Sequence, residues 1–173
     1  MEEIQKEIFK RKEFRNLLIN ILSSLLTDIC KENDISQIKN NEKINPFISK
    51  IKNSITIKNY LGRLVKYTQA ESSTLIAMLI YIDRLCEINN FIINSFNVYK
   101  IIFSSLVIAI KYNEEEYFGN KYLAKVGGLS LNEMNLLELI YLNLIDFNLY
   151  VSDEVFQTYY NNINATINEI ILK

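Results

Sequence analysis

Apolar residues recur every three or four positions along most of the chain, and polar residues fill the positions between them. This spacing is the pattern of helices that bury one face. Two segments, residues 72–89 and 97–112, are apolar almost all the way round, which is typical of helices inside a domain. The pattern predicts helices over residues 12–32, 54–68, 72–89, 97–112, 119–126, 130–147 and 153–171.

A polar, asparagine-rich stretch separates the first predicted helix from the others. It reads KENDISQIKNNEKINPFISKIKN and contains the only proline of the chain, Pro46. Such a composition interrupts regular structure and indicates a connector, either an irregular loop or a tether. We therefore divide the chain into an N-terminal helix with its connector (residues 1–53), a compact helical domain (54–150) and a C-terminal helix (151–173).

Two adjacent glycines, Gly127 and Gly128, could either bind a phosphate group or end a helix. They follow a short predicted helix, and Ser130 with Glu133 three residues later forms a capping box that starts the next one. A phosphate-binding loop would need a preceding strand and a GxGxxG or GxxxxGK[ST] spacing, and the sequence has neither. The glycines therefore predict a corner between two helices.

The composition excludes most catalytic chemistry. Of 173 residues, 49% are hydrophobic and 23% are charged, which suits one globular domain. The chain has no histidine, and this removes histidine-based nucleophile pairs, general bases and metal ligands. Cys30 and Cys86 lie far apart within apolar helical patterns, so they predict buried thiols in a reducing compartment. We expect no catalytic residue, no metal and no cofactor.

Charge and hydropathy also limit the partners. Lys and Arg number 19 against 20 Asp and Glu, so there is no basic field that would attract nucleic acid. No stretch approaches the ~18 uninterrupted apolar residues of a membrane span, and no cleavage pattern of a targeting segment follows the N-terminus. We therefore expect a soluble intracellular protein that binds neither nucleic acid nor membrane.

Several strings resemble the cyclin box, a fold of five helices. YIDRL at residues 81–85 resembles the second-helix motif of that fold, with Asp83 and Arg84 expected to form an internal pair or exposed charges. AIKYNEEEYFGNKYLAKVGGLSLNEMNLLELIYL resembles the third to fifth helices of the phosphate-regulation (P-type) cyclins, and SITIKNYLGRLVKYT resembles their first helix. The resemblance covers most of residues 14–160. It implies an all-α fold, with a single five-helix cyclin box over 54–150 and additional N-terminal and C-terminal helices.

The resemblance also implies a function. Cyclins are regulatory subunits that bind and activate cyclin-dependent Ser/Thr protein kinases, in the cell cycle or in phosphate signalling, without chemistry of their own. In the family, a lysine that ends the third helix and a glutamate on the fifth bond backbone groups around the kinase's mobile regulatory helix, the C-helix. The matching positions are Lys111 and Glu138, and the adjoining apolar positions that receive that helix are Tyr112, Leu142, Phe147 and Leu149. The resemblance implies a protein of the nucleus or cytoplasm, monomeric when free.

Three other functions stay open from the residues. One is a cyclin-fold adaptor in transcription or scaffolding without a kinase partner, and another is a small helical enzyme that uses carboxylates or lysine. The third is a membrane-surface protein that uses the helix over residues 12–32. Taken alone, Lys111 is typical of a lysine that complements a helix dipole, and Glu138 of a solvated charge. Cell-cycle cyclins dock substrates through a MRAIL-type string, but residues 53–57 read NSITI here, so we expect no such docking.

Overall fold

The computed structural model describes residues 2–36 and 46–172. These residues form seven helices and no strand, so the predicted all-α fold is confirmed. The helices are α1 (Glu2–Ser36), α2 (Ile57–Thr68), α3 (Ser72–Asn89), α4 (Val98–Asn113), α5 (Asn120–Gly127), α6 (Leu131–Leu144) and α7 (Asp153–Ile171). None of them, within the described ranges, is both long and apolar enough to cross a bilayer.

The helix that differs most from its predicted bounds is α1. It begins at Glu2 instead of near residue 12 and continues to Ser36, inside the predicted connector. Its first turns are mostly charged, and Ile4, Ile8 and Phe9 did not suffice to reveal the helix among them. Glu7 and Arg11 form an ion pair across one helical turn, at 2.8 Å, and such pairs favour a solvated helix.

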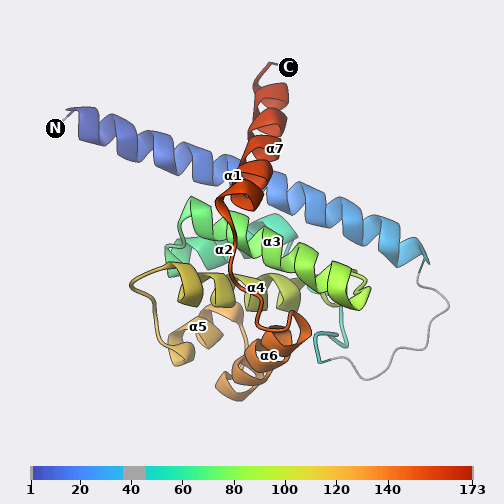
Figure 1. Ribbon diagram of the computed structural model, residues 1–173. Helices are drawn as coiled ribbons and strands as arrows, with labels where there is room; N and C mark the ends of the chain where they lie inside the picture. Colours follow the sequence, from blue (N-terminus) through green and yellow to red (C-terminus); the bar gives the residue numbers. More distant parts are fainter. Residues whose placement is uncertain (1, 37–45, 173) are drawn as a thin grey trace.

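Two helices form the centre of the molecule. In Figure 1, α3 and α4 lie between α1 on one side and α5 and α6 on the other, while α7 crosses α1 and points away from the body. Every residue of α4 from Ile101 to Ile110 is buried, and α3 is buried almost as completely. The sequence places apolar residues all the way round both helices because each helix has neighbouring helices on every side.

A stripe of leucines fixes α1 on this centre. Leu18, Leu22 and Leu26 follow one another at intervals of four, and each is at most 1% exposed. They pack where α1 contacts α2, α3 and α7. Burying a leucine completely contributes about 1.5–3 kcal/mol, so three of them hold the helix firmly in place.

The described part of the connector, residues 46–53, is a fixed loop. The Phe47 ring is fully buried and lies edge-on to the rings of Phe91 and Tyr141. The Lys100 ammonium donates to the Pro46 carbonyl oxygen at 3.1 Å. These residues therefore form an irregular loop that packs on the core; the rest of the Asn-rich stretch, residues 37–45, lies outside the described residues, so the choice between loop and tether stays a prediction there.

The two glycines form the predicted corner. Gly128 has φ 75°, in the left-handed region, and its N–H bonds the carbonyls at the end of α5. Ser130 then caps α6 by accepting from the Glu133 N–H at 3.1 Å, while the Glu133 carboxylate pairs with Lys100 at 2.8 Å. Gly127 serves a different purpose: a Cβ there would lie 2.3 Å from the Phe103 ring, so α5 can approach α4 only through a glycine.

Gly127→Ala should destabilise the fold by about 1–3 kcal/mol, because the buried Phe103 ring leaves no space for a methyl group. Gly62→Ala is the matched control, since a Cβ at that mid-helix position meets nothing within 4 Å. It should stabilise the protein by up to about 1 kcal/mol through helix propensity. Urea unfolding of both variants measures the two effects, and equal shifts would contradict the close approach at Gly127.

Candidate functional site

Lys111 and Glu138 meet at the junction of two helices. Lys111 lies in the last turn of α4, where it leaves the core, and Glu138 lies in the middle of α6. The lysine Nζ contacts both carboxylate oxygens, at 2.6 and 2.8 Å, and the two side chains are only 23% and 17% exposed. Neither residue is therefore the simple surface charge that it resembled when taken alone.

Four side chains near this pair were predicted to form an apolar contact surface, and the structure divides them into two groups. Tyr112 and Phe147 are each more than half exposed, so they are available to a partner. Leu142 and Leu149 are partly buried and pack against the core. The structure therefore makes the first two the projecting parts of the surface and the other two its base.

Two further leucines of α6 are exposed, and sequence reasoning missed them; one of them, Leu139, follows Glu138 directly and extends the surface. Leu136 and Leu139 are each more than half exposed, although α6 already buries Met134, Leu137 and Tyr141 on its inner face. The sequence does hint at them, because α6 carries more apolar residues than one buried helix face needs. The contact surface therefore consists of Lys111, Glu138, Tyr112, Leu139, Leu142, Phe147 and Leu149, while Leu136 lies on nearly the opposite side of the helix from Glu138.

The turn after α6 holds Phe147 in an uncommon backbone conformation. Asp146 and Phe147 have φ 53° and 52°, so two successive residues other than glycine occupy the left-handed region. The Phe147 N–H bonds the Leu142 carbonyl oxygen at 2.8 Å and closes the turn. Such conformations cost on the order of 1 kcal/mol each and persist only where the surroundings impose them. Here they direct an aromatic ring outward.

The YIDR string of α3 is what imposes this turn. The Tyr81 hydroxyl donates to the Leu149 carbonyl oxygen at 2.8 Å. The Arg84 guanidinium donates to the carbonyl oxygens of Asn148 and Tyr150, at 2.6 and 2.8 Å. Three consecutive carbonyl groups are thus held by one helix, and Phe147 and Leu149 are positioned with them. These contacts join segments that are far apart in the sequence.

Asp83 holds the next element. Its carboxylate accepts a hydrogen bond from the Tyr159 hydroxyl of α7 at 2.7 Å, and burial raises the pKa of Asp83 although this hydrogen bond acts in the opposite direction. The expectation that Asp83 and Arg84 pair with each other or stand exposed is therefore wrong. Each fixes a different part of the chain that follows α6.

The cysteines take no part in this surface. Burial raises the pKa of the Cys30 thiol to about 12 and that of the Cys86 thiol to about 11, so both stay protonated at neutral pH and are weak nucleophiles. Across residues 2–36 and 46–172, no group of three His, Cys, Asp or Glu could hold a metal ion. What the surface around Lys111 and Glu138 offers is binding: a desolvated ion pair among exposed apolar side chains.

Comparisons with known proteins agree on one family. The family model described as Cyclin matches residues 16–149. Cyclin-U4-1 of Arabidopsis thaliana is 35% identical, over 83% of this chain and 73% of the relative. PHO85 cyclin-like protein psl1 of Schizosaccharomyces pombe is 39% identical, over 61% of this chain and 44% of the relative. PHO85 cyclin-7 of Saccharomyces cerevisiae is 32% identical, over 83% of this chain and 59% of the relative, so this chain spans only part of each relative's length.

Lys111→Ala should lower the free energy of unfolding by about 1–3 kcal/mol, because it leaves the Glu138 carboxylate largely buried without its partner. Glu138→Ala should lower the free energy of unfolding by a similar amount, because it leaves the Lys111 ammonium group without its partner. The double variant Lys111→Ala/Glu138→Ala should lose clearly less stability than the two single variants lose together, because neither charge is then left without a partner. Lys125→Ala, an exposed lysine of α5, is the control and should change stability by less than about 0.5 kcal/mol.

Proposed function

The chain belongs to the cyclin family, and on this basis we propose that the surface around Lys111 and Glu138 binds and activates a cyclin-dependent protein kinase. Family membership confirms that the chain is a regulatory cyclin and not itself an enzyme, and the relatives named above confirm the resemblance to P-type cyclins. Two relatives carry the kinase name PHO85 in their own names, which supports a kinase of this class as the partner.

The observation that carries the proposal is the ion pair at the centre of the contact surface. An ammonium group has three donors, and Glu138 uses only part of the Lys111 capacity. A carboxylate has about four lone-pair sites, of which Lys111 takes two. The pair can therefore donate to a carbonyl and accept from N–H groups at the same time. The ends of a helix are where a protein presents such unpaired backbone groups.

The apolar side chains around the pair supply the remaining contact. Tyr112, Leu139 and Phe147 are exposed on different elements, and the first two are direct sequence neighbours of Lys111 and Glu138, whose own side chains are largely buried. Aromatic and aliphatic residues around a few charged anchors are typical of the energetically important part of an interface. A kinase helix with one apolar face and one free end fits this pattern, so we infer that the regulatory C-helix is the bound element.

Activation follows from holding that helix in one place. Kinases need a Lys–Glu ion pair involving the C-helix, together with a correctly placed metal-binding aspartate. A partner that binds the C-helix only in its active position shifts the population of the kinase toward the active state. The hydrogen bonds that Tyr81 and Arg84 donate to the carbonyl groups after Phe147 hold this part of the contact surface in place before the kinase binds, so little conformational entropy is lost on binding. We further propose that the free chain is monomeric and acts in the nucleus or cytoplasm.

Exchanging the two charges separates binding from folding. In Lys111→Glu/Glu138→Lys the ion pair can form again, so stability should stay within about 1 kcal/mol of the original chain. The kinase backbone would then face the wrong charge at both anchors, and binding should weaken more than about tenfold. The kinase that co-purifies with the tagged chain from its native cells is identified and purified, and its dissociation constant and phosphorylation rate are measured with each variant.

The matched control is a second charge exchange at a site far from α6. Asp28 and Lys31 form an exposed ion pair on α1, at 2.9 Å, and Asp28→Lys/Lys31→Asp should leave kinase binding unchanged. Equal binding by both exchanged variants would show that Lys111 and Glu138 are not anchors. The chain would then fit the alternative of a cyclin-fold adaptor.

Phe147→Asn tests the apolar part of the surface. Asparagine tolerates the left-handed conformation better than phenylalanine, so the melting temperature should stay the same or rise. Kinase binding should weaken about tenfold or more, because an exposed aromatic anchor is lost. The neighbouring Asp146→Asn retains the backbone conformation without removing apolar surface, and it should bind normally. A calorimetric titration that finds no difference between these variants would remove Phe147 from the interface.

A further inference from the structure

A groove of about 930 Å³ runs between α1 and α2. These two helices lie on a different side of the molecule from α6 (Figure 1). Four cationic side chains line it: Lys12 and Arg15 from α1, and Lys58 and Lys66 from α2. No aspartate or glutamate is among the lining residues. The chain as a whole has a net charge of −1, so the groove is a local patch of positive charge on a protein that is nearly neutral overall.

The carboxylates of the described residues do not neutralise these four cations. Within the described residues, none of the four forms an ion pair. Arg15 donates to the Ala70 carbonyl oxygen at 3.3 Å, and the Lys66 ammonium lies 5.5 Å from the centre of the Tyr67 ring. Lys12 and Lys58 are exposed. Unpaired cations around one groove leave room for an anionic ligand to supply the missing charge.

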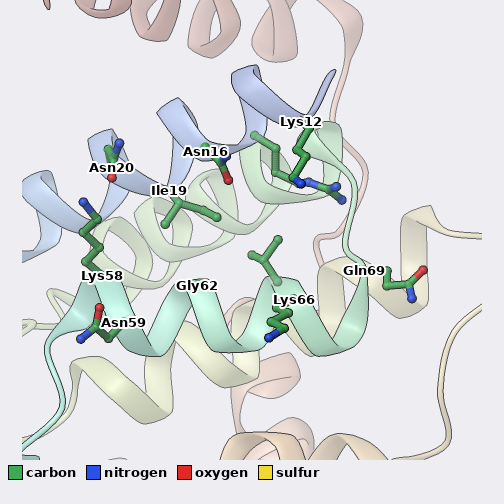
Figure 2. A pocket seen from close by; sticks show the side chains of 11 residues that line it. Lys12, Asn16, Ile19, Asn20, Lys58, Asn59, Gly62, Lys66 and Gln69 are labelled. Atoms are coloured by element: carbon green, nitrogen blue, oxygen red, sulfur yellow. The ribbon is translucent and has the colours of Figure 1, made fainter. Parts of the chain in front are cut away.

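Gly62 keeps the middle of the groove open. It stands inside α2, four residues from Lys58 and four from Lys66, and Figure 2 shows the ribbon bare between these two lysines. A Cβ at Gly62 would meet nothing within 4 Å, and its φ is not positive, so neither packing nor backbone conformation requires a glycine. Glycine there costs up to about 1 kcal/mol of helix stability relative to alanine. The space beside Gly62 is therefore open to a ligand.

The remaining lining suits a peptide backbone. Asn16, Asn20 and Asn59 line the groove (Figure 2), and in the described part of the protein their amide groups form no hydrogen bond. Each amide offers two donors and an acceptor, which complement the alternating N–H and C=O groups of an extended chain. Ile19 and Val65, both buried, form an apolar floor beneath them.

The spacing of the lysines sets the spacing of the ligand's charges. Lys58 and Lys66 are two turns and a little more apart on α2, or roughly 12 Å along the helix axis. An extended peptide advances about 3.3 Å per residue, so residues four apart are separated by roughly 13 Å and lie on the same face. Two anionic residues at that spacing could reach both lysines at once.

We propose that this groove binds an extended acidic segment of a partner protein, with two carboxylates four residues apart. Carboxylates fit better than phosphates because the lysines that line the groove stand apart from one another. A phosphate group carries up to two charges and three acceptor oxygens, so it is best held by several donors that converge on one point, whereas a single lysine can pair with one carboxylate. The groove is built from α1 and α2 alone, so it can be tested on the free chain, and its failure would leave the kinase surface untouched.

Synthetic peptides of known charge spacing test the proposal. Fluorescein-labelled Gly-Ser peptides carry two glutamates spaced two, four or six residues apart, or two lysines four apart, and fluorescence anisotropy measures their binding to the full chain. The four-residue spacing should bind about fivefold to tenfold more tightly than the other two, and the lysine peptide should not bind. Added salt should weaken binding, because the charges involved are exposed.

Variants of the groove give the structural control. Gly62→Gln should weaken binding of the four-residue peptide about tenfold while keeping the melting temperature at or above that of the original chain, since glutamine favours helix. Gly62→Ala, which adds little bulk, should weaken it much less. Lys58→Ala and Lys66→Ala should each weaken binding several-fold, and Lys125→Ala, outside the groove, should not.

Three results would overturn the proposal. Equal binding of peptides with different glutamate spacings, or unchanged binding by Gly62→Gln, would show that the groove attracts anions without selecting an extended acidic segment. Tighter binding of a phosphoserine peptide, or of single-stranded DNA with the same charge, would assign the groove to a different ligand. Absence of binding at peptide concentrations of about 1 mM and low salt would show that the groove takes no acidic segment.

Discussion

Two helices that are apolar around their whole circumference, α3 and α4, must be covered on every side, and this requirement arranges the rest of the molecule. α1 and α7 cover α3, α6 covers α4, and α5 can come close enough to α4 only because Gly127 has no side chain. The covering helices are amphipathic, so each turns its other face to solvent. Both proposed binding surfaces lie on these outer faces, so their positions follow from the packing of the core.

Polar groups on both central helices organise the contact surface. α4 leaves the core at Lys111, where the ammonium group meets Glu138 of α6. In the second half of α3, Tyr81 and Arg84 hold the carbonyl groups that follow Phe147. A rigid core is thus linked by hydrogen bonds to the side chains that would meet a kinase, and rigidity of this kind reduces the entropy lost on association.

Sequence reasoning reached the helices and the corner at Gly128 because both depend on local rules of periodicity and capping. The motif likeness singled out Lys111 and Glu138, although nothing in their spacing says that they bond each other. The exposure of Leu136 escaped, because a surface leucine and a core leucine look alike in a hydrophobic pattern. The carbonyl partners of Arg84 lie more than sixty residues along the chain, and only the folded structure brings them together. Long-range contacts of this kind leave no periodic signal in the sequence.

The two proposed surfaces differ in their physics. The Lys111–Glu138 pair is largely buried, so mobile ions screen it little and its hydrogen bonds stay strong. Lys12, Lys58 and Lys66 stand in water, where the Debye length is about 8 Å at physiological salt and each charge contributes modestly. The first arrangement suits a long-lived kinase complex, and the second suits a segment that binds and leaves quickly. A cyclin built in this way could keep one kinase while exchanging the proteins that it brings to it, because joining the two sites on one rigid body raises the local concentration of whatever the groove holds.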